Sequence, residues 1–160
     1  MFLMQKVVDL VGCGLVDIVV FDSYIKGKHS IFHLAGHANI SGTNGRGKTS
    51  TLSLIPLFFG ATPDKLVNRN KGRFIDFYLP SDQSFIAFQY QRFDGMCSVF
   101  VYANKSRDGS LCYRFVQGDI EAVTQDETFK ELLKSTKSIS DTFKKLSFNP
   151  KFEMTNQIEN

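Results

Sequence analysis

Residues 42–49 read GTNGRGKT, and they lie between the segment His37–Ser41 (HANIS) and an apolar, helix-like segment, Lys48–Phe59. The run fits the pattern GxxxxGK[ST] in full. Its glycines permit positive φ, so that successive backbone N–H groups can turn inward around an anion at the start of a helix. His37–Ser41 is predicted as a short strand and Lys48–Phe59 as a helix that Pro56 kinks. This part of the chain therefore predicts the order strand, glycine loop, helix.

The chemistry of this phosphate-loop motif is that of polyphosphate binding. Lys48 would supply a point charge to the β- and γ-phosphate oxygens, and the Thr49 hydroxyl would bind Mg²⁺ bridging the same phosphates. Arg46 occupies a variable position, where a phosphate contact, a partner contact and a solvated side chain are all open. The expected nucleotide-binding residues are Gly42, Thr43, Asn44, Gly45, Arg46, Gly47, Lys48, Thr49 and Ser50.

Length and composition limit the remaining possibilities. With 160 residues the chain is worth about one domain, and 42% hydrophobic with 22% charged residues excludes the disordered classes. A net charge of +3 is far below that of a dedicated nucleic-acid-coating protein. Three cysteines without CxxC spacing suggest neither a disulfide framework nor a zinc ribbon. Because neither a signal peptide nor a membrane-spanning run is found, we expect a cytoplasmic domain with no membrane partner.

The rest of the chain is predicted from β-branched and aromatic alternation and from helix-capping charges. A basic loop, residues 60–73, separates the phosphate-loop region from a run of antiparallel strands. The predicted strands are 6–11, 15–21, 30–34, 74–79, 84–92, 96–103 and 110–116, and the predicted helices near the carboxyl end are 126–135 and 138–146.

Three segments together resemble a known family. Phe21–Tyr24 (FDSY), Ile31-Phe32 and Asn39–Ser50 (NISGTNGRGKTS) resemble the amino-terminal head of the structural-maintenance-of-chromosomes (SMC) and related ABC-type ATPases. The pair Asn44-Gly45 within the loop is typical of those heads. Residues 73–80 and 84–90 look most like the MukB-type branch, which includes JetC of the Wadjet plasmid-defence condensins.

The resemblance implies an α/β fold, the amino-terminal lobe of a P-loop NTPase of the ABC/SMC-head type with an antiparallel β-subdomain. Residues 1–160 would form a single domain, with a P-loop unit at 1–60, a β-subdomain at 74–117, and helices at 126–146 leading to a coiled coil outside this chain. It also implies ATP and Mg²⁺ as cofactors. The implied partners are a carboxyl-terminal head lobe, a second head, DNA and a kleisin-type subunit, and the implied location includes the bacterial nucleoid.

The implied role is chromosome or plasmid organisation or DNA defence. ATP would be hydrolysed in a complete head dimer, whereas this chain alone should be catalytically silent, because it lacks the signature motif and the strand ending in Asp-Glu. Gln117 resembles the Mg²⁺-contacting Gln of such heads, although it equally fits a strand end. Arg69, Lys71 and Arg73 lie where those heads place basic residues that sense nucleotide or touch DNA, and a solvated basic loop is the alternative.

Other classes remain open at this stage. A small P-loop nucleotide kinase would share the loop, although the β-rich centre argues against it. A non-catalytic nucleotide-binding interaction module is the other alternative. A zinc site formed by His29, His33 and His37 is excluded, because residues four apart on a strand are separated by about 13 Å.

Overall fold

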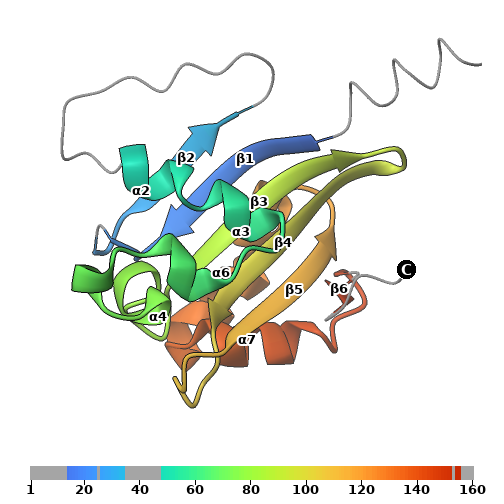
Figure 1. The fold of residues 1–160 in the computed structure, drawn as a ribbon. Helices are drawn as coiled ribbons and strands as arrows, with labels where there is room; N and C mark the ends of the chain where they lie inside the picture. The colour runs from blue at the N-terminus through green and yellow to red at the C-terminus, as the bar shows by residue number, and fades with distance from the viewer. Residues whose placement is uncertain (1–13, 25, 35–47, 153, 156–160) are drawn as a thin grey trace, which may run out of the picture.

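A computed structural model describes residues 14–24, 26–34, 48–152 and 154–155. Within these ranges an antiparallel sheet of order β2-β1-β3-β4-β5-β6 lies between two layers of helices (Figure 1). The strands are β1 (Gly14–Phe21), β2 (His29–His33), β3 (Phe85–Arg92), β4 (Gly95–Ala103), β5 (Leu111–Gln117) and β6 (Met154–Thr155). The helices are α2 (Lys48–Leu52), α3 (Ile55–Phe58), α4 (Phe74–Tyr78), α5 (Ile120–Thr124), α6 (Glu127–Thr136) and α7 (Ile139–Leu146), with 3₁₀ turns η1 (Pro63–Leu66) and η2 (Arg69–Lys71).

The strands bury side chains on both faces of the sheet, because successive residues of a strand point in opposite directions. On β1, Ile18 and Val20 belong to one core cluster and Val19 to the other. β4 is buried along its last seven residues, which explains its nearly continuous apolar sequence. The sheet is therefore covered on both of its faces.

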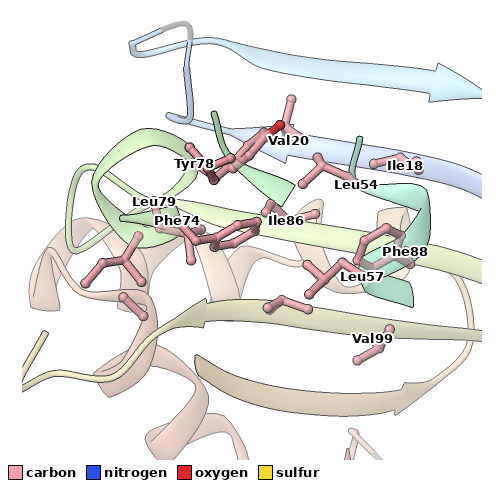
Figure 2. Packing of buried hydrophobic residues seen from close by; sticks show 14 residues of the cluster. Ile18, Val20, Leu54, Leu57, Phe74, Tyr78, Leu79, Ile86, Phe88 and Val99 are labelled. Atoms are coloured by element: carbon pink, nitrogen blue, oxygen red, sulfur yellow. The ribbon is translucent and has the colours of Figure 1, made fainter. Parts of the chain in front are cut away.

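The first face of the sheet is covered by the segment between β2 and β3. Leu54, Leu57, Phe74 and Tyr78 come from this segment and pack on strand residues, as Figure 2 shows. Each such side chain contributes about 1.5–3 kcal/mol on full burial. This packing therefore places α3 and α4 over β1, β3 and β4.

The second face is covered by α5, α6 and α7. Phe143 of α7 is fully buried, and its ring centroid lies 5.0 Å from that of Phe100 and 5.5 Å from that of Tyr102. Side-chain oxygens begin all three helices: Asp119 accepts from the amide of Ala122, Asp126 from those of Thr128 and Phe129, and Ser138 from that of Asp141.

Much of the predicted secondary structure is confirmed. β1 and β2 match the predicted strands 15–21 and 30–34, and β3, β4 and β5 form the expected antiparallel run. α6 and α7 match the predicted helices 126–135 and 138–146. The predicted strands 6–11 and 37–41 lie outside the described residues.

The predicted strand 74–79 is wrong, since α4 occupies these residues. The buried residues Phe74, Ile75, Tyr78 and Leu79 have the spacing i, i+1, i+4, i+5, which places them on one side of a helix. The Asp64 carboxylate accepts a hydrogen bond from the Phe74 amide at 3.1 Å, which satisfies one of the free N–H groups of the first turn.

The single kinked helix predicted over Lys48–Phe59 is two short helices, α2 and α3. Pro56 has no N–H to donate one turn back, so the helix breaks before it and restarts with Pro56 in the first turn of α3. The loop predicted over residues 60–73 contains the turns η1 and η2, and α5 was not predicted.

Strands from two of the predicted subdivisions, residues 1–60 and 74–117, lie in one sheet. β1 and β2, from the first 60 residues, share one sheet with β3–β5, from residues 74–117. α6 and α7 pack on that sheet, and the chain then returns to pair β6 with β5. A coiled coil beyond this chain stays a prediction. In the described ranges, none of the helices has the length and apolarity needed to cross a membrane.

Candidate functional site

The carboxyl end of the phosphate-loop motif coincides with the start of a helix. α2 begins at Lys48, so that Lys48, Thr49 and Ser50 occupy its first turn. The Thr49 side chain is exposed, while its backbone carbonyl accepts from the amide and the hydroxyl of Ser53 at 2.9 and 2.7 Å. The other six predicted nucleotide-binding residues, Gly42, Thr43, Asn44, Gly45, Arg46 and Gly47, lie outside the described residues.

Two tyrosine hydroxyls hold α2 against the sheet. The Tyr24 hydroxyl is hydrogen-bonded to the hydroxyl of the fully buried Thr51 at 2.5 Å. The Tyr78 hydroxyl donates to the Ser50 carbonyl at 2.7 Å, and the Tyr78 carbonyl accepts from the Ser23 hydroxyl at 2.6 Å. Because a helix of five residues is unstable by itself, these contacts and the core below determine where α2 lies.

Both tyrosines are protonated at neutral pH, as an exposed tyrosine would be, and burial moves their ionisation to still higher pH. Burial raises the pKa of Tyr78 to about 12, with a smaller contribution from the neighbouring Tyr24. Burial also raises the pKa of Tyr24, although the hydrogen bond with Thr51 partly offsets this effect. Both hydroxyls are therefore available as hydrogen-bonding groups under physiological conditions.

The basic segment that contains Arg69, Lys71 and Arg73 lies beside this anchor. The Lys71 ammonium lies 4.4 Å from the centroid of the Phe77 ring, which stacks on Tyr24 at 6.1 Å. Lys71 is thus connected to α2 through two aromatic rings. Arg69 is exposed in η2.

Arg73 has a different partner. Its guanidinium pairs with Asp76 at 3.0 Å, and both side chains are about half exposed. The hydrogen bond between them lowers the pKa of Asp76 and raises that of Arg73. Such an exposed pair is weak, so it orients Arg73 without neutralising the surface strongly.

Gln117 lies at a different end of the sheet from α2. It is exposed at the end of β5 opposite Cys97, whose thiol donates to the Gln117 amide oxygen at 3.4 Å. The register across β4 and β3 continues to Leu15 near the start of β1, whereas Tyr24 follows the end of β1. The structure therefore does not bring Gln117 together with Thr49.

His29 and His33 form cross-strand contacts, and His37 lies outside the described residues. His33 Nδ1 lies 2.7 Å from the Asp17 carboxylate, and His29 packs edge-on against Phe21 at 6.4 Å. In the part of the chain that the structure describes, no group of three or more His, Cys, Asp or Glu side chains could hold a metal ion.

Sequence reasoning missed the two tyrosine anchors. Tyr78 falls in the predicted strand 74–79, where successive side chains would point to opposite faces, whereas it lies in α4. The signal that could have found it is the helical spacing of Phe74, Ile75, Tyr78 and Leu79. The FDSY segment contains Tyr24 but does not predict its hydrogen bond, because the partner Thr51 is 27 residues away.

Comparison with known proteins places the chain in a family without naming a function. A family model described as "Protein of unknown function (DUF3584)" matches residues 19–136. No curated protein and no solved structure matches the chain.

Proposed function

The chain belongs to the DUF3584 family of proteins of unknown function, and we propose that it binds Mg-ATP as the amino-terminal head lobe of an SMC-like ATPase. One observation carries the proposal: the complete motif GTNGRGKT runs directly into α2, which begins at its lysine. The resemblance of residues 21–24, 31–32 and 39–50 to the heads of SMC-type ATPases supports the same function. The MukB-type branch, which includes JetC of the Wadjet plasmid-defence condensins, is the finer form of the proposal.

The residues at the start of α2 fit Mg-ATP. Thr49 presents an exposed hydroxyl, and oxygen ligands are what Mg²⁺ prefers. In the proposed site Lys48 neutralises the β- and γ-phosphates, while residues 42–47 surround them with backbone N–H groups. Bound Mg²⁺ supplies further charge neutralisation at the same phosphates.

Because α2 is anchored to the sheet, the helical part of the proposed ATP site is already in place before ATP binds. Thr51 is fully buried and Ser50 is bonded to Tyr78, so the first turn that carries Lys48 and Thr49 is held from below. A ligand then needs to order less of the chain, and affinity rises accordingly. Hydrolysis belongs, in this proposal, to a complete head dimer with its carboxyl-terminal lobes.

Titration of the chain with fluorescent ATP in the presence of Mg²⁺ tests the proposal. Lys48→Ala should weaken binding at least about tenfold, the loss expected for one charge-assisted contact. Lys134→Ala is the matched control, because Lys134 is exposed on α6 on the second face of the sheet, and its affinity should equal that of the wild type. Equal affinity in Lys48→Ala and the wild type would refute ATP binding through the motif.

Steady-state phosphate release separates the head lobe from the kinase alternative. The chain alone should release no phosphate above background, because the head-lobe proposal assigns part of the catalytic site to a second lobe. Appreciable turnover by the isolated chain would favour a small nucleotide kinase.

We extend the proposal to DNA at the basic segment of the complete protein. Arg69 and Lys71 are exposed and lie on the same side of the sheet as α2. Fluorescence anisotropy with duplex DNA at several salt concentrations tests this extension. Each alanine variant should lower the slope of log K against log salt by about one, and unchanged slopes in both would refute it.

A further inference from the structure

A polar cavity lies away from the phosphate-loop motif. Its volume is about 320 Å³, and it forms where three connections meet: residues 81–84 before β3, 103–107 after β4, and 136–141 between α6 and α7. In Figure 1 the loop after β4 lies beside the helices of the second layer. No residue of α2 lines the cavity.

Charged side chains of both signs line this cavity. Lys105 pairs with Asp141 at 3.0 Å, and Arg107 Nη1 lies 3.6 Å from the Asp82 carboxylate. Within the described ranges, Lys137 has no carboxylate within ion-pair distance, and its side chain is exposed. The cavity therefore carries three cations against two carboxylates and has a net positive charge.

Arg107 leaves a hydrogen-bond donor unused at this cavity. Its Nη2 donates to the Leu79 carbonyl at 2.8 Å, which fixes the plane of the guanidinium. Nη1 is buried and has no hydrogen-bond partner among the described residues, and its distance to Asp82 exceeds that of a hydrogen bond. A buried donor without an acceptor is costly, so a ligand oxygen placed here would be stabilised.

Three left-handed backbone positions lie at or next to the cavity. Among the described residues other than glycine, positive φ occurs at Asp22 (45°), Arg107 (51°) and Lys137 (53°). Arg107 and Lys137 line the cavity, and Asp22 hydrogen-bonds to two of its lining residues, Ser81 and Ser84. Lys137 is the left-handed cap that ends α6, and Arg107 lies in the turn between Asn104 and Ser110, so these local turns fix the positions of both cations at the cavity.

We propose that this cavity binds the phosphate group of a small hydroxylated molecule, a sugar phosphate or a nucleotide. Arg107 and Lys137 supply the cations for the phosphate, and the Ser140 hydroxyl lines the same space. Asp82 and Asp141 supply acceptors for ligand hydroxyl groups. The volume is at the lower end of small-molecule sites, and a concave site with one net positive charge suits a terminal phosphate better than the backbone of a duplex.

Ribose 5-phosphate is the probe for this site, because it has a phosphate and hydroxyls but no base or polyphosphate. Two-dimensional ¹H–¹⁵N NMR of the full chain should show shifts of the amides of residues 105–107 and 137–141 during titration. Lys137→Asn removes the charge while keeping a residue that tolerates positive φ, and it should weaken binding about tenfold. Arg107→Gln should weaken it by a similar factor, and Lys134→Gln and Lys48→Ala should bind as the wild type does.

Each result of the ribose 5-phosphate titration either supports or overturns the proposal. Shifts confined to these amides and weakened in Lys137→Asn, whose remaining spectrum reports its fold, support the proposal. No shifts at millimolar ribose 5-phosphate overturn it, as do shifts that disappear in Lys48→Ala, because those would belong to the phosphate-loop motif. A parallel titration with a short DNA duplex that moves these amides where ribose 5-phosphate does not would also overturn it, in favour of a nucleic-acid backbone.

Discussion

The Tyr78 hydroxyl should stabilise the protein at neutral pH and destabilise it at high pH. Tyr78→Phe removes the hydrogen bond to the Ser50 carbonyl while keeping the ring, which is 2% exposed. The loss of one such bond, with a carbonyl left unsatisfied, should lower the free energy of unfolding by about 1–2 kcal/mol near pH 7.5. For a chain of this length that corresponds to about 2–8 °C in the melting temperature.

At high pH the difference should shrink and then change sign. Burial raises the pKa of Tyr78 from 10.0 to about 12 in the folded protein. The folded state therefore holds this proton more tightly than the unfolded state does, and the resulting stabilisation is present below pH 10 and is lost between pH 10 and about 12. Two pKa units correspond to about 2.7 kcal/mol, more than the hydrogen bond contributes. Tyr78→Phe has no proton to lose there, so it should be the more stable protein near pH 12.

Urea unfolding followed by circular dichroism at pH 7.5, 9, 10, 11 and 12 measures both effects. Tyr113→Phe is the neutral-pH control, because Tyr113 is 37% exposed and its hydroxyl is in none of the hydrogen bonds found in the described ranges. Curves for Tyr78→Phe and the wild type that stay parallel from pH 7.5 to 12 would refute the reasoning, as would equal stability at pH 7.5.

Three further substitutions test the packing and the helix ends. Phe143→Ala empties a fully buried site between α7 and the sheet and should cost about 3–5 kcal/mol by urea unfolding; a loss below 1 kcal/mol would contradict that packing. Asp64→Ala removes the acceptor of the Phe74 amide and should cost about 1 kcal/mol, whereas a helix that did not need this cap would be unaffected. The pKa of Asp126 is lowered chiefly by its hydrogen bond with Lys151, so the stabilisation from this pair is present above pH 4 and is lost as the pH falls further. Asp126→Asn should therefore be less stable than the wild type at pH 7 and should lose less stability between pH 7 and low pH. A loss of stability on acidification as large as that of the wild type would argue against the pair.

The parts of the fold that local sequence determines could be predicted. The hairpin of β3 and β4 follows from two alternating runs on either side of Asp94-Gly95, and Gly95 has the positive φ of 135° that suits glycine. α6 and α7 follow from Asp126 and Ser138, which cap helices with amphipathic sequences. In each case the deciding contacts lie within a few residues of one another.

The features that the sequence did not predict correctly depend on contacts between residues far apart in the chain. The six residues FIDFYL are apolar enough for a strand, but the spacing of Phe74, Ile75, Tyr78 and Leu79 also fits one side of a helix. Contacts with Asp64 and with the first core cluster decide for the helix. Tyr24 and Tyr78 reach partners 27 and 28 residues away, so the local sequence pattern does not predict their hydrogen bonds. The cavity joins three segments from distant parts of the chain and was likewise not predictable, although two of its cations are in loops where positive φ is common.

The basic residues that the sequence groups together face two different sites. Lys71 contacts Phe77, whose ring continues to Tyr24 and α2, so a change in charge there acts beside the phosphate-loop motif. Arg73, two residues later, pairs with Asp76 and donates to the Arg107 carbonyl at 3.4 Å, which places it behind the polar cavity. The turn at Gly72, with a φ of 80°, separates the two directions. Variants of Lys71 and of Arg73 should therefore not be interchangeable, since each residue lies beside a different one of the two proposed anion sites.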